Sequence, residues 1–356
     1  MFYDIQESAT GGIRLSRYQQ IKEKLYSNPR TWLVTGGAGF IGSNLVKSLL
    51  QLGQYVRVLD DLSTGYWENV AQVIKETGHQ KTENLTFRNG DIYSLETCCS
   101  LCEGVDHVLH QAAQVSVPLS MEDPLLNNRT NVDGFLNMLV GARNSGVKTF
   151  VFASSCAVYG DDPELPKTED MKGFPISPYG LTKLMAEQYA ALYHSIYGSR
   201  PIGLRYFNVF GPRQDPGGAY AAVIPRWISM LLSGRSPVIY GDGEQTRDFC
   251  HIDNVVQANI LAACTVNEEA FGQVFNVGCG RSTSLNELFG LILDSMRRTG
   301  LDVNDPRPIH EAPREGDIIH SKADITKART FLGYEPEVSV SQGLERSIQW
   351  YLDNLK

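Results

Sequence analysis

A tyrosine and a lysine four positions apart, with a serine upstream, are the residues in this sequence best suited to move a proton. Tyr179 and Lys183 are expected to share one face of a helix, where residues four apart are neighbours. A nearby ammonium favours the phenolate, so we expect Lys183 to lower the pKa of Tyr179 toward that of a general base. Ser155 ends the preceding predicted strand, from which its hydroxyl can hold a substrate oxygen against Tyr179. Together they predict removal of a proton from a substrate hydroxyl.

A glycine-rich turn is the second feature with a chemical role. Three glycines are spaced G-x-x-G-x-x-G, at Gly36, Gly39 and Gly42. They follow the apolar run 32–34 and precede a segment with helical spacing, so the backbone can approach a pyrophosphate at a helix N-terminus. The next predicted strand, 55–59, ends at Asp60, at the distance where an acidic side chain meets the adenosine ribose hydroxyls. This combination predicts NAD rather than NADP, because the charge of Asp60 would repel a ribose phosphate.

The predicted elements between these residues alternate between strand and helix. Further strands are expected at 85–88, 105–110 and 149–153, with a long helix over 124–145. Such alternation predicts an α/β fold with a doubly wound parallel sheet, whose ligand lies at the carboxyl ends of the strands. From residue 204 onward the sequence is richer in proline and glycine, which suggests a smaller α/β lobe.

The expected organisation therefore has three parts. Helical spacing of apolar residues between 15 and 25 predicts a helix within an N-terminal extension, residues 1–29. A NAD-binding Rossmann domain is expected over 30–203, with a return segment at about 237–278. The substrate lobe is expected to comprise 204–236 and 279–356.

The composition excludes several classes of partner. The chain of 356 residues has a formal charge of −8, which gives no basic field for nucleic acid or an anionic membrane. Neither a secretion signal nor an apolar run long enough to span a bilayer is found, so a cytoplasmic protein is expected. Seven cysteines, an odd count, favour free thiols. Cys98, Cys99 and Cys102 lack a second ligand pair with zinc spacing, so no metal site is expected.

Six stretches of the sequence resemble the extended short-chain dehydrogenase/reductase family. They are Thr35 to Gly42, Val151 to Gly160, Ser177 to Lys183, Leu204 to Asn208, Gly241 to Asp253 and Arg314 to Asp317. Within that family the sequence is similar to the UDP-galactose 4-epimerases and, more closely, to the UDP-N-acetylglucosamine 4-epimerases. The resemblance runs from about residue 30 to the C-terminus. It implies reversible C4 epimerisation of a UDP-sugar through a 4-keto intermediate with bound NAD, without net oxidation.

The resemblance also assigns residues to roles. Ser155, Tyr179 and Lys183 would be catalytic, with Lys183 also binding the nicotinamide ribose. The cofactor would be bound by Gly36, Gly39, Phe40, Ile41, Gly42, Asp60, Asp61, Asp91, Ile92, Gln111, Ala112, Ala113, Tyr179, Lys183, Tyr206 and Phe207. The substrate would contact Ser116, Ser155, Asn208, Val223, Tyr240, Arg247, Arg314, Asp317 and Ser321. Among these, Asn208, Arg247 and Arg314 would face the diphosphate, Val223 and Tyr240 the uracil, and Asp317 the uridine ribose.

Sibling chemistries of the same family differ at two positions. The 4,6-dehydratases carry an Asp-Glu pair where this chain has Cys156 and Ala157, and UDP-glucuronate decarboxylases place a glutamate at the Ala157 position. Elimination and decarboxylation are therefore disfavoured, although a dehydratase or decarboxylase remains an alternative. Cys156 is interpreted as a packing residue.

The identity of the sugar rests on the residue before Lys322-Ala323-Asp324. A tyrosine there restricts relatives to unsubstituted hexoses, whereas Ser321 leaves room for an N-acetyl group at C2. We therefore expect UDP-GlcNAc and UDP-GalNAc as substrates, with UDP-glucose and UDP-galactose as further candidates. Epimerisation of a UDP-uronate or a UDP-N-acetylhexosaminuronate, and a non-catalytic NAD-binding role, stay open. The resemblance further implies a homodimer, formed through the helix after Tyr179 and the helix over 124–145.

Overall fold

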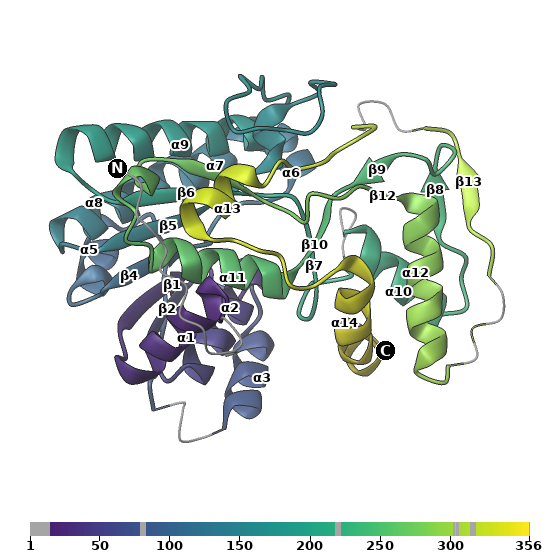
Figure 1. Ribbon diagram of the computed structural model, residues 1–356, viewed down its shortest axis with the longest axis horizontal. Coiled ribbons are helices and arrows are strands. Elements are labelled where there is room, and N and C mark those ends of the chain that lie inside the picture. Colours follow the sequence, from purple (N-terminus) through teal and green to yellow (C-terminus); the bar gives the residue numbers. More distant parts are fainter. Residues whose placement is uncertain are drawn as a thin grey trace, which may run out of the picture.

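A seven-stranded parallel sheet forms the centre of the computed structural model, which describes residues 15–78, 83–217, 222–301, 303, 306–313 and 318–355 (Figure 1). The strand order is β11-β6-β5-β4-β1-β2-β3, and every neighbouring pair is parallel. The strands are β1 (Thr31–Thr35), β2 (Tyr55–Asp60), β3 (Leu85–Asn89), β4 (His107–His110), β5 (Thr149–Ser155), β6 (Pro201–Tyr206) and β11 (Val274–Val277). Because the order reverses between β1 and β4, a crevice for a ligand is expected there, at the carboxyl edge.

Helices cover both faces of this sheet, which confirms the doubly wound prediction. One face is covered by α1 (Arg17–Ser27), α2 (Phe40–Gln51), α3 (Trp67–Thr77), α11 (Ile252–Ala263), the 3₁₀ turn η3 (Glu268–Ala270) and α13 (Thr326–Leu332). The other face is covered by α5 (Leu95–Cys102), α8 (Phe135–Asn144) and α9 (Pro178–Tyr197). Successive strand residues point to opposite faces, so Val34 packs in the first cluster and Leu33 in the second.

The segment predicted as one long α-helix, 124–145, changes its hydrogen-bond pattern midway. It consists of α7 (Pro124–Asn128), the π-helical turn η1 (Arg129–Gly134) and α8, and it follows the short helix α6 (Val117–Glu122). Within the π turn the Asn131 amide donates to the Gln114 carbonyl and to Thr182 Oγ1, and accepts from the Gln114 N–H. The prediction of a continuous α-helix was wrong at this turn, where the Asn131 side chain joins three segments of the chain.

A second group of elements packs beside the sheet, on the right in Figure 1. Its helices are α10 (Val223–Leu232), α12 (Leu285–Arg298) and α14 (Val340–Asn354). Its strands form three two-stranded pairs: β7 (Asn208–Phe210) with β10 (Phe249–His251), β8 (Val238–Tyr240) with β13 (Ile309–Glu311), and β9 (Thr246–Arg247) with β12 (Thr283–Ser284). Trp227, Phe289 and Tyr351 belong to a hydrophobic cluster of this group alone. We propose that this group is the substrate lobe and the sheet with its helices the cofactor lobe. The bounds differ from the predicted ones, since β8, β9 and β10 fall within the predicted return segment 237–278 but belong to this group, whereas α13 packs on the sheet.

Helix α1 lies in the part of the N-terminal extension that the structure describes. Ser16 caps it reciprocally with Gln19, and Ile21 and Leu25 are buried in the cluster that includes α11. The amide of Gln54 donates to the Leu25 carbonyl, which fastens the helix to the start of β2. Among the described residues, no helix combines the length and apolarity needed to cross a lipid bilayer.

Candidate active site

The glycine turn between β1 and α2 is shaped for a close approach of backbone or ligand. Gly36 has a φ of +67°, and a Cβ there would lie 2.7 Å from the Ala112 nitrogen. At Gly42 a Cβ would lie 2.0 Å from the Gly36 carbonyl oxygen. Only glycine fits at either position, so the turn forms the cradle in front of a helix N-terminus that a dinucleotide pyrophosphate requires.

Asp60 ends β2 beside this cradle. One carboxylate oxygen accepts the Ala38 N–H at 2.8 Å and the other accepts the Leu62 N–H at 2.9 Å. Burial raises the pKa of Asp60, and these two hydrogen bonds oppose the rise. The carboxylate is thus held at the edge of the glycine turn, where it can accept ribose hydroxyls. The exposed Asp61 accepts from Ser63 instead.

The remaining predicted NAD residues follow the carboxyl ends of neighbouring strands. Phe40 and Ile41 open α2 and are half-buried, as are Ala112 and Ala113 after β4. Asp91 and Ile92 follow β3; Asp91 accepts the Tyr93 N–H at 2.8 Å, and burial raises its pKa. Tyr206, at the end of β6, donates to Gln111 at 3.2 Å and lies beside the buried Phe207. The chain therefore presents a set of residues that fits NAD at the sheet's switch point.

Ser155 and Tyr179 come together from β5 and α9. Ser155 is the last residue of β5, and its hydroxyl accepts the Ala157 N–H at the start of the 3₁₀ turn η2 (Cys156–Tyr159). Ser177 caps α9, and the Tyr179 N–H donates to Ser120 at 3.2 Å. Hydrogen bonding with Ser155 stabilises the phenolate of Tyr179, so the two hydroxyls share one site.

The electrostatics of Tyr179 differ from the sequence prediction. Burial raises the pKa of Tyr179 to about 12, and only the hydrogen bond with Ser155 opposes this rise. The Lys183 ammonium lies 5.8 Å from the centre of the Tyr179 ring and donates to the Ala153 carbonyl at 2.9 Å. Burial lowers the pKa of Lys183 to about 8. Without cofactor, desolvation of the phenolate therefore dominates the pKa of Tyr179, and its lowering by Lys183 together with a positive nicotinamide ring stays a prediction.

A buried ion pair that the sequence analysis missed anchors the catalytic helix. Glu187 on α9 binds Arg205 on β6, with Oε1 to Nε at 2.9 Å and Oε2 to Nη2 at 2.7 Å, and also accepts from Ser154 on β5. Both charged side chains are only 6% exposed. Glu187 follows Tyr179 and Lys183 at the same four-residue spacing, so it lies on the same face of the helix. A carboxylate on this inward face was the sequence signal that could have predicted a buried partner of opposite charge.

Three predicted substrate residues are gathered around β9. The Asn208 N–H donates to the Asp248 carbonyl at 3.0 Å, and Ser321, 8% exposed, donates its N–H to the Thr246 carbonyl at 3.0 Å. Arg247 Nη1 donates to the carbonyls of Thr246 and Ile319 at 3.0 and 3.2 Å. These backbone bonds therefore bring Asn208 and Arg247, the predicted diphosphate contacts, into one region with Ser321, which is predicted to lie beside C2 of the sugar.

Asp248 was not predicted as a site residue, yet it holds this region together. Its carboxylate accepts the N–H groups of Cys279, Gly280 and Ala323 at 2.7, 2.9 and 3.1 Å. Burial raises the pKa of Asp248 to about 6. Through these bonds it joins the loop after β11 to the segment that follows Ser321. A charged residue next to a buried strand was the only sequence signal.

Other predicted substrate residues lie further out. Ser116 caps α6, with its hydroxyl accepting the Leu119 N–H, while Val223 begins α10 and Tyr240 ends β8, both half-buried. The predictions for Arg314 and Asp317 lie outside the described residues.

Cys156 interacts electrostatically with both Tyr179 and Arg247. Burial raises its pKa to about 11, the positive charge of Arg247 lowers it, and the thiol in turn raises the pKa of Tyr179. Its side chain packs against the cluster beneath α11. A neutral thiol thus stands where a dehydratase would carry a carboxyl group.

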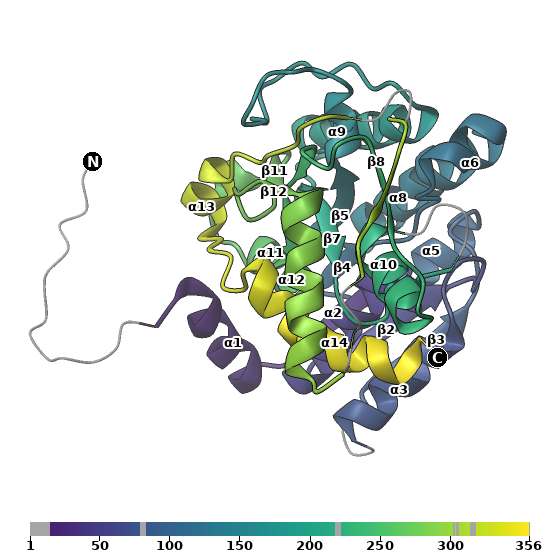
Figure 2. The same cartoon turned by 90° about the vertical axis from the view of Figure 1, so that its right-hand side faces the viewer.

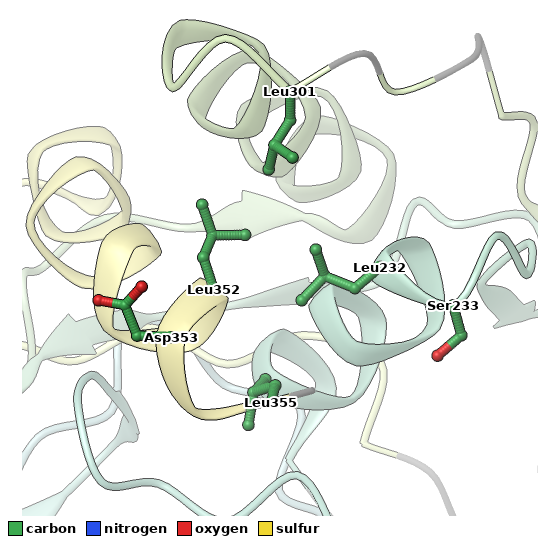
Figure 3. A pocket seen from close by; sticks show the side chains of 6 residues that line it. All are labelled: Leu232, Ser233, Leu301, Leu352, Asp353 and Leu355. Carbon is green, nitrogen blue, oxygen red and sulfur yellow. The ribbon is translucent and has the colours of Figure 1, made fainter.

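A cavity in the second group contains none of the predicted site residues (Figure 3). It has a volume of about 380 Å³ and is lined by Leu232, Ser233, Leu301, Leu352, Asp353 and Leu355. In the described part of the chain, no three His, Cys, Asp or Glu side chains gather as metal ligands.

The fold and this site define an NAD-dependent enzyme of the extended short-chain dehydrogenase/reductase class. Residues 32–278 match the model of the NAD dependent epimerase/dehydratase family, and the chain belongs to that family. A UDP-glucose 4-epimerase from Mycolicibacterium smegmatis is 37% identical over 90% of this chain and 97% of its own length. A UDP-glucuronate 4-epimerase from Thermodesulfobacterium geofontis is 33% identical over 91% and 97%. The solved UDP-N-acetylglucosamine 4-epimerase of Methanobrevibacter ruminantium M1, in complex with UDP-N-acetylmuramic acid, is 38% identical with a TM-score of 0.83, over 91% and 99%.

Proposed function

We propose that this protein interconverts the C4 epimers of a UDP-sugar, with UDP-GlcNAc and UDP-GalNAc as its substrate pair. The observation that carries the proposal is the meeting of Ser155 and Tyr179 beside the glycine cradle, with Lys183 one helical turn further on. Relatives with three different sugars in their names share this fold, so the substrate is argued from individual residues.

In the proposed reaction Ser155 orients the 4-hydroxyl and Tyr179 takes its proton. When bound, NAD would accept the hydride of C4 and return it to the opposite face of the resulting 4-keto sugar, so that no net oxidation results. The tyrosine later returns the proton to the oxygen of the epimer. A phenol with a pKa near 12 is almost entirely protonated at neutral pH, and only its phenolate can act as the base. The positive charge of bound cofactor and of Lys183 is therefore needed to favour the phenolate.

Elimination of water and decarboxylation are the less favoured alternatives. Both need a carboxyl group beside the sugar, and Cys156 and Ala157 stand at those positions. With its pKa raised to about 11, the Cys156 thiol remains neutral at physiological pH and supplies no base. A product of unchanged mass distinguishes epimerisation from either loss.

The UDP end of the substrate is proposed to lie across β9. Arg247 and Asn208, with Arg314, would bind the diphosphate, because guanidinium groups match its geometry. Val223 and Tyr240 would flank the uracil, Asp317 the ribose, and Ser116 the sugar side near α6.

Preference for an N-acetyl group is inferred from Ser321. The residue is nearly buried, fastened by its backbone to Thr246, and its small side chain leaves space beside the C2 position. UDP-uronates are the main rival substrates. A rival function is the binding of NAD without catalysis. The uronate reading is weakened because Pro118-Leu119 stands where some uronate-acting relatives have Pro-Arg.

We also propose a homodimer built on α9 and α7. These helices expose Leu125, Leu181, Leu192, Ile196 and Tyr197, of which Leu125 is 81% exposed. A second copy with the same face would cover them.

Proton NMR of the purified protein with UDP-GlcNAc, without added cofactor, tests the proposal. We expect the anomeric signal of UDP-GalNAc to appear, which requires epimerisation and NAD carried through purification. Turnover of UDP-glucose or of a UDP-uronate alone would overturn the assignment of the sugar. If protein that contains NAD turns over neither UDP-GlcNAc, UDP-glucose nor either of the two uronates, catalysis would be overturned and the NAD-binding role would remain.

A further inference from the structure

The segment 211–217, called the strap below, links the proposed UDP site to the cofactor lobe. It follows β7, which begins with Asn208, and precedes α10, which begins with Val223. The strap therefore begins three residues after Asn208 and precedes Val223 in the sequence, and both of these residues are proposed to contact UDP. Its own side chains, however, bind helices α2 and α3 of the cofactor lobe.

Arg213 makes the main connection. Its Nε donates to Ser43 Oγ at 3.0 Å, its Nη2 donates to Asn44 Oδ1 at 2.6 Å, and its Nη1 lies 3.4 Å from Glu76 Oε1. The side chain is only 1% exposed. A guanidinium group suits this position because its planar fork serves three acceptors from two helices at once.

Further bonds hold the strap on either side of Arg213. The Asn44 amide donates to the Pro212 carbonyl at 3.0 Å, and the Tyr66 hydroxyl donates to Asp215 at 2.7 Å. From the substrate lobe, the Tyr351 hydroxyl donates to the Gly211 carbonyl at 2.9 Å. The strap is therefore bonded to both lobes along its length.

The backbone of Arg213 is held in an unfavourable conformation. Its φ is +68°, in the left-handed region that residues with a side chain rarely adopt. Such a conformation persists only where the surroundings fix it, and it often accompanies function. Here the bonds to Ser43, Asn44 and Glu76 fix it. Ser43 and Asn44 lie at the N-terminal end of α2, which begins at the proposed pyrophosphate cradle.

We propose that Arg213 is a positioning residue that keeps the UDP-binding residues of the substrate lobe in place relative to the cofactor helix α2. The proposal rests on the proposed function, since it takes Asn208 and Val223 as contacts of UDP. With its guanidinium group engaged by Ser43, Asn44 and Glu76, Arg213 is not itself proposed to contact substrate or cofactor. Loosening the strap should therefore weaken binding of the nucleotide and leave the chemical step intact.

Arg213→Lys tests this, because lysine keeps the charge but cannot serve all three acceptors. The probe is UDP, titrated calorimetrically into the protein with its bound NAD. We expect the dissociation constant of UDP to rise about tenfold, as for a lost hydrogen bond to a charged group. KM for the UDP-sugar should rise by the same factor, while kcat stays within about twofold. An unchanged UDP affinity, or a fall in kcat with UDP affinity retained, would overturn the role.

Controls separate this role from general stability. Arg200→Lys alters an exposed pair with Glu268 at the amino end of β6, the end opposite to the one that leads to the strap, and should leave UDP binding unchanged. If Arg213→Lys does not fold, Tyr66→Phe removes the bond to Asp215 from an exposed position, and UDP should then bind about threefold more weakly. Tyr26→Phe, which removes an exposed hydroxyl bond to Gln51, is its matched control. Unchanged UDP binding in Tyr66→Phe would count against the strap.

The wild-type protein distinguishes the two proposals. If it neither binds UDP nor epimerises any UDP-sugar, the proposed function fails and the role of Arg213 fails with it. If it does both and Arg213→Lys matches it, only the role of Arg213 is refuted.

Discussion

The cofactor lobe and the substrate lobe fix their functional residues by different means. Ser155 ends a seven-residue strand that is hydrogen-bonded on both sides, to β4 and to β6. Arg247 lies in the two-residue strand β9, which pairs with the equally short β12 and forms a single bridge to His320. In the first lobe a long ladder sets the position of the side chain. In the second, single buried charges such as Asp248 and Arg213 replace the ladder.

This difference indicates where each part of the function resides. A long paired strand holds Ser155 and a capped helix packed on the sheet holds Tyr179, which suits a reaction that depends on the relative placement of two hydroxyls. Short strands and loops tolerate substitution more easily, which suits the choice among sugars within one family. We therefore expect substitutions in the cofactor lobe to abolish turnover and substitutions in the substrate lobe to redirect it.

Tyr179→Phe should have the largest effect. Removal of the general base should lower kcat about 10³-fold, because positioned proton transfer contributes on that scale. The NAD content and the unfolding temperature should change little, since the ring still fills its place. Proton NMR of product formation measures the loss, with Tyr26→Phe as the matched control. Turnover within tenfold of wild type would show that another group takes the proton.

Glu187→Ala should destabilise the cofactor lobe strongly. It leaves the Arg205 guanidinium buried without its carboxylate, which costs about 3–5 kcal/mol. Glu268→Ala, which removes the exposed partner of Arg200, should cost less than about 1 kcal/mol. Denaturant unfolding measures both changes. Equal losses would contradict the view that the catalytic helix is anchored through Glu187.

The sequence predicted the cofactor lobe well because its signals are local and periodic. Strand patterns, the glycine spacing and the Tyr179-x-x-x-Lys183 pair each indicated a position along one edge of the sheet, and the strand order agrees. The π turn around Asn131 was missed because apolar spacing does not distinguish α from π hydrogen bonding. The burial that raises the pKa of Tyr179 was missed because a sequence reveals neighbouring charges but not the extent of burial.

The substrate lobe was less predictable, since its contacts join residues far apart in the sequence. Asp248 bonds to Cys279 and Ala323, and Arg213 bonds to Ser43, about 170 residues away. The spacing of residues along the sequence does not predict such distant partners. Val223, Tyr240 and Arg247 were inferred through resemblance alone, and their roles stay predictions.

Ser321→Tyr should redirect the substrate lobe. A tyrosine at this nearly buried position would fill the space beside C2, so turnover of UDP-GlcNAc should fall about a hundredfold, and UDP-glucose should react as before. Competition between UDP-GlcNAc and UDP-glucose, followed by NMR, measures the ratio of their turnover rates. Unchanged turnover of UDP-GlcNAc would show that residue 321 does not control access of the N-acetyl group. Ser282→Tyr, at an exposed position in the same lobe, is a suitable control.

The smallest expected effect is on the pH dependence of kcat/KM, which reports on Tyr179 and Lys183 in the cofactor lobe. Burial lowers the pKa of Lys183 to about 8, so the ammonium is present below that pH and is lost above it. Since burial raises the pKa of Tyr179 to about 12, the phenolate depends on nearby positive charge. The share of phenolate grows about tenfold per pH unit, but above about pH 8 the share of ammonium falls by the same factor. Activity should therefore rise with pH up to about 8 and then level off. An activity that keeps rising to about pH 10 would mean that the phenolate forms without the ammonium.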